Sequence, residues 1–120
     1  MDILLLFTLL AIKHTFADLF LQTFHNSINK NQYISNAHRH YAEHGVLTLA
    51  ICFWFATPLL AIIVSIFDYI CHWHIDFAKH RLCRYLKVER DTKEFFRIQA
   101  FDQMLHFITY AVIVFILLLL

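Results

Sequence analysis

Residues 70–79 read Ile-Cys-His-Trp-His-Ile-Asp-Phe-Ala-Lys, and this stretch closes an apolar run that begins after Pro58. Within it His72 and Asp76 stand four positions apart, which is close to one turn of an α-helix. On a helix both side chains leave the same face, where they can hold one object between them. The pattern predicts a helix that is apolar over most of its length and carries a polar site near one end.

The composition of the 120-residue chain is that of a membrane protein. Hydrophobic residues make up 60% of it and aromatic residues 17%, with a single glycine and a single proline, which is more apolar surface than a small soluble core can bury. Four apolar stretches approach the ~20 residues that cross a bilayer. They cover residues 3–24, 41–57, 59–77 and 100–120. We therefore predict an all-α membrane protein, a single domain over residues 1–120 in which four transmembrane helices form a compact bundle.

The positive charges predict how this bundle is oriented. Six Lys and Arg residues fall in residues 81–97, between the third and fourth stretches, and Lys30 and Arg39 fall between the first and second. The positive-inside rule places both connections in the cytoplasm, with both termini outside. The first stretch has no basic region before it and no cleavage motif after it, so we expect it to be retained and not removed as a signal peptide.

Residues 81–97 carry an apolar ridge, Leu82, Tyr85 and Leu86, among their basic residues. Such a pattern is typical of a short helix on an anionic leaflet, and equally of a solvated basic loop. We expect a short basic interfacial segment between the third and fourth helices, with the fourth helix starting near Thr92. The net charge of the chain is only +1, which gives no support to nucleic-acid binding.

Every predicted span carries a histidine at a similar depth. At 1.5 Å per residue, each of these histidines lies roughly 20 Å from the outer face, in the cytoplasmic half of the membrane. They are His14, His44, His72 and His106. Asp18, Asp76 and Asp102 lie within about one turn of this layer. Isolated charges there would cost about 2.5–3.5 kcal/mol each, more in sum than a small domain can tolerate, so these groups must satisfy one another or a ligand.

Three interpretations fit this layer. It is a metal site if the His and Asp side chains converge as ligands within the bundle, and a set without thiolates suits Zn, Mn or Fe. It is a structural network if each histidine donates to an aspartate and the contacts only fix the helix register. It is a proton or ion relay if the groups carry charge through the membrane. We favour the metal interpretation, because intramembrane ionisable groups are functional by default.

The predicted metal ligands share this layer and come from all four spans. They are His14, Asp18, His44, His72, Asp76, Asp102 and His106. If the protein is an enzyme, such a site favours metal-assisted hydrolysis, in which an aspartate that is not a ligand (Asp18, Asp76 or Asp102) acts as the general base. A set of polar and basic side chains is expected at the rim, where it would hold an anionic lipid headgroup or a phosphorylated substrate. This set is Gln22, Lys79, Arg81 and Arg84.

Other histidines and aromatic residues are expected outside the site. We expect His25, His38 and His80 to be surface residues, and His74 lies off the face that His72 shares with Asp76. Exposed aromatic residues, such as Phe53, Phe55 and Phe115, would face lipid or a second copy in a homo-oligomer. The rival class is a non-enzymatic membrane protein in which the polar layer only holds the helices together.

Several of these motifs occur together in one known family. They are His14-Thr-Phe-Ala-Asp18-Leu-Phe-Leu-Gln22-Thr, the Lys30 that follows, His44-Gly45, His72-Trp-His-Ile-Asp76-Phe-Ala-Lys79 and Phe101-Asp102-Gln103-Met-Leu-His106. In their order over nearly the whole chain, the sequence resembles the small prokaryotic and phage membrane family catalogued as domain of unknown function 3307. It departs from that family at Leu19-Phe20 and at the extra His74. The resemblance implies a compact polytopic protein, expected in a prokaryotic inner membrane, and carries no activity with it.

Overall fold

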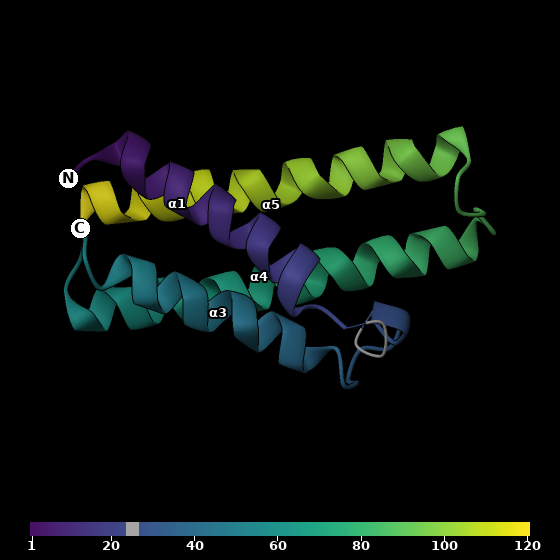
Figure 1. Ribbon diagram of the computed structural model, residues 1–120, viewed down its shortest axis with the longest axis horizontal. Helices are drawn as coiled ribbons and strands as arrows, with labels where there is room; N and C mark the ends of the chain where they lie inside the picture. The colour runs from purple at the N-terminus through teal and green to yellow at the C-terminus, as the bar shows by residue number, and fades with distance from the viewer. Residues whose placement is uncertain (24–26) are drawn as a thin grey trace.

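The computed structural model describes residues 1–23 and 27–120, and over this range the chain forms helices and no strand. The helices are α1 (Ile3–Phe16) with its π-helical extension η1 (Ala17–Leu21), α3 (His38–Cys52), α4 (Pro58–Tyr85) and α5 (Lys93–Leu119). Figure 1 shows α4 and α5 as a long pair that α1 crosses, with α3 beside one half of α4. α4 packs against α3 and α5, and α1 packs against the same two helices. The prediction of an all-α bundle is confirmed.

Three of these helical segments, not four, are long and apolar enough to cross a membrane. They are Ile3–Leu21, Pro58–Tyr85 and Lys93–Leu119. α3 has only 15 residues, about 22 Å at 1.5 Å per residue, which is short of the ~30 Å hydrocarbon layer. Its helix ends at Cys52 because residues 53–57 form the turn into α4, with Thr57 extended before Pro58. The predicted span over residues 41–57 is therefore wrong, and the last residue of the predicted span 3–24 lies outside the described residues.

The expected basic segment over residues 81–97 is shorter than predicted, because the two long helices extend into it. α4 continues to Tyr85 and α5 begins at Lys93, so only residues 86–92 connect them. Lys87 and Asp91 have positive φ angles of 52° and 63°, and these left-handed residues let the chain reverse. The fourth helix does start as predicted: the Thr92 hydroxyl accepts a hydrogen bond from the amide of Phe95, at 3.2 Å.

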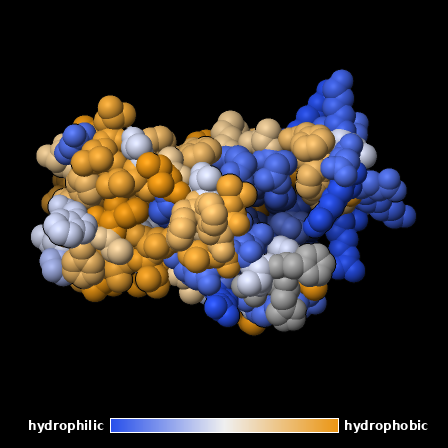
Figure 2. All heavy atoms as spheres, viewed as in Figure 1, coloured by the Kyte–Doolittle hydropathy of each residue, from blue (hydrophilic) through white to orange (hydrophobic). Residues whose placement is uncertain are grey.

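The apolar and polar parts of the bundle lie at opposite ends. Both termini and the turn between α3 and α4 share one end of the molecule (Figure 1). The hydrophobic core, which includes Leu6, Leu10, Val64 and Ile113, joins the helices towards that end. In Figure 2 hydrophobic residues dominate that end, whereas the ends of α4 and α5 beside their connection are hydrophilic. The histidine layer lies where the apolar core gives way to the polar half.

A close approach of α3 and α4 fixes the register of the site. A Cβ on Gly45 would lie 3.3 Å from the carbonyl oxygen of Ser65 and 3.4 Å from Cβ of Tyr69. The Ser65 hydroxyl donates a hydrogen bond to the Gly45 carbonyl oxygen, at 2.7 Å. The only glycine of the chain therefore lies where α3 and α4 approach closely enough to crowd a side chain. Because His44 precedes Gly45, this contact also positions that histidine against α4.

Candidate metal centre

The four histidines of the expected layer meet inside the bundle, and none is more than 2% exposed. The rings of His44 and His72 are stacked with their centroids 3.7 Å apart, and the rings of His72 and His106 lie 4.1 Å apart. The ring of His14 lies 4.8 Å from that of His106. His72 on α4 is therefore the central member, with an imidazole from α3 on one side and one from α5 on the other.

The Asp18 carboxylate joins the imidazoles of two helices. Its Oδ2 lies 3.1 Å from Nε2 of His14, and its Oδ1 lies 3.0 Å from Nε2 of His44 and 3.2 Å from Nε2 of His40. Asp18 lies in the π-helical turn η1, where the amide of Gln22 donates to the carbonyl oxygen of Ala17 five residues earlier, at 2.9 Å. π-Helical turns inside α-helices are frequent at functional sites, and this one aims Asp18 at α3.

His40 completes this group, although sequence reasoning left it out. Its side chain is fully buried, and it lies one turn before His44 on the same face of α3. The four-residue spacing was a usable signal. Depth alone does not select His40, because it identifies one histidine in each predicted span and the second span begins at Tyr41.

The carboxylates of α4 and α5 form a second group. Oδ1 of Asp76 lies 3.1 Å from Nε2 of His106, which lies 3.7 Å from Oδ1 of Asp102. Oδ2 of Asp76 lies 3.5 Å from Nε2 of His72 and 2.6 Å from the ammonium of Lys30. Lys79 approaches Oδ2 of Asp102 at 3.8 Å. All three of the predicted aspartates thus lie against buried imidazoles.

These contacts make three overlapping sets whose possible ligand atoms lie within 4.8 Å of one another. The sets are Asp18, His40, His44 and His72; His14, His72 and His106; and Asp76, Asp102 and His106. Each contains nitrogen ligands, two also contain carboxylate oxygens, and none contains a thiolate. Nitrogen and oxygen donors of this kind suit Zn, Mn or Fe. The described residues therefore hold His/Asp groups that can bind a metal ion.

The central imidazole has no hydrogen bond that would explain its burial. Neither ring nitrogen of His72 has a hydrogen-bond partner among residues 1–23 and 27–120, and the same holds for Oδ1 of Asp102. His72 is 1% exposed. An unpaired polar group in an apolar interior costs roughly 1–3 kcal/mol by mutational measures. Such a cost needs a compensating partner, and the nearest groups to His72 are other ligand-type side chains.

In a neighbouring group of polar side chains, by contrast, the charges and hydrogen-bonding groups satisfy one another. The ammonium of Lys13 lies 2.5 Å from Oδ2 of Asp68 and 3.2 Å from Nδ1 of His44. The hydroxyl of Thr48 donates to the same Asp68 oxygen, at 2.5 Å. Lys13 thus contacts Nδ1 of His44, the ring nitrogen that does not face Asp18. Asp68 is paired with Lys13 and needs no metal ion. Asp68 belongs to the supporting structure of the site.

A polar cavity of about 350 Å³ opens onto the site. Gln22, Lys30 and Lys79 line it together with Asp18, Asp76 and Asp102. Arg81 and Arg84, expected at this rim, are exposed and line a separate pocket with Tyr85, because α4 runs straight past the cavity. Lys30 lines the cavity instead. It is 6% exposed and bonded to Gln22 Oε1, at 2.5 Å.

The histidines expected outside the site divide into two kinds. His74 is exposed, as its off-face position predicts, and bonds the hydroxyl of Tyr33 at 3.2 Å. His38 and His80, expected at the surface, are half-buried. Nδ1 of His38 lies 2.5 Å from the hydroxyl of Tyr69, and Nδ1 of His80 lies 2.8 Å from the backbone oxygen of Asp76. His25 lies outside the described residues.

Comparison of the chain with protein-family models, with curated proteins and with solved structures finds no match. The geometry of the buried His/Asp groups and of the cavity above them is the basis for assigning a function.

Proposed function

We propose that this integral membrane protein holds one or two divalent metal ions, Zn, Mn or Fe, in its His/Asp site, and that it hydrolyses a phosphorylated or lipid ester there. One observation carries the proposal. His72 is a buried imidazole at the centre of the bundle, it has no hydrogen bond to any described residue, and ligand-type groups surround it on three helices.

The contacts of His72 favour an ion over a purely structural network. In a network that only fixes helix register, each histidine would donate to an aspartate, as His106 can to Asp76 at 3.1 Å. His72 instead stacks on His44 and lies 3.5 Å from Asp76 without hydrogen-bond geometry. An ion held by His72, His106, Asp76 and Asp102 would take the free lone pair of His72 and the unpaired oxygen of Asp102. A second ion would be held at Asp18, His40 and His44.

The charges around the cavity also support an ion. Its lining contains three carboxylates, Asp18, Asp76 and Asp102, and two ammonium groups, Lys30 and Lys79. With neutral imidazoles these leave one net negative charge, which opposes the binding of a phosphate. A single divalent ion reverses the sign, and the two lysines then add to the attraction.

This arrangement has the parts that metal-assisted hydrolysis needs. The ion would lower the pKa of a bound water and polarise the phosphoryl or acyl oxygen. Asp18 is the aspartate that stays free when the Asp76 group holds the ion, and its side chain is 28% exposed at the cavity. In this one-ion state we assign it as the general base, whereas a second ion at Asp18 would make it a ligand. Lys30 and Lys79 would hold the oxygens that do not react.

The proposal includes the orientation of the protein. Both termini lie at the apolar end (Figure 1), and the basic residues of the α4–α5 connection lie at the other end. By the positive-inside rule the cavity would open to the cytoplasm of a prokaryotic cell. Membership of the domain of unknown function 3307 family belongs to the same proposal.

Elemental analysis of protein purified in detergent, without chelators or an affinity tag, tests the metal site. The wild type should carry about one or two equivalents of Zn, Mn or Fe, and His72→Ala should carry far less. His74→Ala is the matched control, because His74 lies on the same helix but is exposed. Asp102→Asn, which changes one oxygen into an amide, should lower the metal content with little change in side-chain volume.

A wild type that contains no metal, and takes up none when it is added, would overturn the metal site and the hydrolase together. The histidine layer would then be a register-fixing network or a proton relay. Metal-loaded protein should next be assayed against phosphorylated and lipid esters, with the Asp18→Asn variant as the test of the general base.

A further inference from the structure

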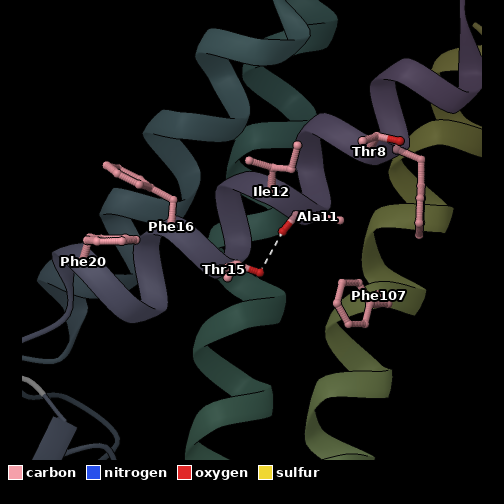
Figure 3. Close-up of a pocket in the computed structure, with 8 residues that line it drawn as sticks. Thr8, Ala11, Ile12, Thr15, Phe16, Phe20 and Phe107 are labelled. Atoms are coloured by element: carbon pink, nitrogen blue, oxygen red, sulfur yellow. Dashed lines mark hydrogen bonds between the residues drawn. The ribbon is translucent and has the colours of Figure 1, made fainter.

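An apolar groove of about 520 Å³ runs along the outside of the bundle, between α1 and α5. Figure 3 shows its lining side chains: Ile12 and Phe16 extend from α1 and Phe20 from η1, while Phe107 extends from α5 towards Ala11 and Thr15. The Thr15 hydroxyl donates to the carbonyl oxygen of Ala11, at 3.3 Å. The polar group of Thr15 is thus used within its own helix, and apart from Thr8 the other lining residues are apolar.

The groove meets the polar cavity at Thr15, which lines both. His14 lies next to Thr15 and lines the cavity, and its ring centroid is 5.8 Å from that of Phe107 in the groove. The groove and the cavity are therefore adjacent and share Thr15 as a lining residue. From Thr15 the groove extends towards Phe7, in the direction of the apolar end of the bundle, and in the other direction towards Phe20.

A second apolar groove provides an internal comparison. It has a similar volume, about 530 Å³, and lies between α1 and α3, where Leu5, Leu47, Ala50 and Trp54 line it. Among the described residues it shares no lining residue with the polar cavity. Both grooves can accept the hydrocarbon chain of a membrane lipid, but only the α1–α5 groove can accept one whose headgroup lies in the cavity.

We propose that the α1–α5 groove binds the hydrocarbon chain of a single-chain phosphorylated amphiphile, whose phosphate lies in the polar cavity. This inference rests on the proposed function and names its substrate class. Lys30 and Lys79 in the cavity complement the phosphate charge, and the lipid-facing groove complements the chain. The order from polar cavity to apolar end matches the order from headgroup to tail in one leaflet. A phosphate bound in the cavity would hold its own chain at the mouth of the groove at high effective concentration.

Photo-crosslinking in lipid nanodiscs tests the inference. The probe is a long-chain alkyl phosphate with a diazirine near the middle of its chain, and the comparison probe is the corresponding alcohol without the phosphate. With the phosphate probe, the wild type should be labelled in the α1–α5 groove roughly tenfold more than in the α1–α3 groove. Excess inorganic phosphate should remove that preference, because it competes for the cavity. The alcohol should label both grooves similarly.

Two variants locate the chain, and a third is the control. Ala11→Phe fills the floor of the groove, and Thr8→Trp fills it from an exposed position that does not disturb the core. Both should lower the labelling of the α1–α5 groove by the phosphate probe to the level of the alcohol. Ala50→Phe makes the same change of volume in the α1–α3 groove and should leave that labelling unchanged. Thermal unfolding in detergent identifies any variant that has not folded.

The outcomes separate this inference from the proposed function. Equal labelling of the two grooves in metal-loaded wild type, or preferential labelling that Thr8→Trp does not reduce, would overturn the amphiphile site while the metal site stands. A metal-free wild type that still shows the phosphate-dependent preference would support the amphiphile site and overturn the hydrolase. Labelling in which the phosphate probe and the alcohol behave alike assigns both grooves to ordinary membrane lipid and overturns the inference.

Discussion

The ammonium of Lys13 and the carboxylate of Asp68 lie 2.5 Å apart in the interior of the bundle, where both are almost fully buried. The pair connects α1 with α4, and Thr48 adds a hydrogen bond from α3 to the same carboxylate oxygen. Two opposite charges and a hydroxyl satisfy one another here. The histidine layer directly beside it differs, because its central imidazole makes no hydrogen bond to any described residue.

Removing one member of the Lys13–Asp68 pair should therefore destabilise the protein strongly. Lys13→Met leaves a buried carboxylate without its cation, which typically costs about 3–5 kcal/mol. Chemical unfolding of the purified protein in detergent measures the loss. The double variant Lys13→Met/Asp68→Leu removes both charges and should recover most of the stability. A double variant as unstable as Lys13→Met would show that the charges themselves hold the helices together.

The fold was largely predictable because its main signal, the length of the apolar runs, is local. The error came from α3. Residues 41–57 have the composition of a span, but a reversal before Pro58 needs residues 53–57, and the helix ends at Cys52. Pro58 predicts that the chain turns here, but it does not predict how many residues the turn requires. The same limit made residues 81–97 look like a separate segment, although α4 and α5 extend into them.

The candidate site was predictable where helical spacing and depth decide position. All seven predicted ligands lie in or beside the three buried groups. Lys30 could not be placed in this way, because it lies on a connection without helical period. Its position depends on how residues 27–37 fold back onto α4, which is a tertiary contact. Arg81 and Arg84 do not line the cavity for a related reason: their distance from it depends on the straight course of α4.

Removal of the metal should lower the thermal stability of the wild type. Without the ion, the cluster keeps an unpaired His72 and an unpaired Asp102 oxygen. A ligand present at 100 times its Kd stabilises the folded state by about 2.7 kcal/mol, so re-addition of the metal should raise the unfolding temperature in a concentration-dependent way. Differential scanning fluorimetry in detergent, with and without a chelator, measures the shift.

The same measurement on two histidine variants shows whether the effect belongs to the site. His72→Ala should show no shift with metal, whereas His74→Ala should respond as the wild type does. Stabilisation of all three proteins by the same amount would assign the effect to metal bound elsewhere on the chain, and would contradict the prediction.

Gly45 should tolerate only a very small side chain. A Cβ there already lies 3.3 Å from the Ser65 carbonyl oxygen and 3.4 Å from Tyr69 Cβ, so Gly45→Leu must push α3 away from α4, at a cost of roughly 1–3 kcal/mol. The shift should also move His44 and lower the metal content. Gly45→Ala, which needs the neighbours to yield by only a few tenths of an ångström, should do much less. Thermal unfolding and elemental analysis report the two effects, and equal behaviour of the two variants would refute the close contact.

The connection that carries Lys30 should depend on an aromatic contact outside the cavity. The indole N–H of Trp73 donates to the backbone oxygen of Tyr33, at 2.9 Å, and the two rings lie 4.5 Å apart. Three residues before Tyr33, Lys30 reaches Asp76. Trp73→Ala should therefore release residues 27–37 and weaken phosphate binding by roughly tenfold, as Lys30→Met does, because about 1.4 kcal/mol of positioning is lost. The metal content should stay unchanged, since neither residue is a ligand.

Calorimetric titration of inorganic phosphate into the detergent-solubilised protein measures this effect. Trp54→Ala is the control, because Trp54 is 88% exposed and lies at the other end of the bundle, and it should bind phosphate as the wild type does. Trp73→Phe keeps a ring against Tyr33 but loses the hydrogen bond, and should fall between the two. If Trp73→Ala binds phosphate normally while Lys30→Met does not, Lys30 reaches the cavity without the aromatic contact, and its position is fixed by its contacts with Asp76 and Gln22.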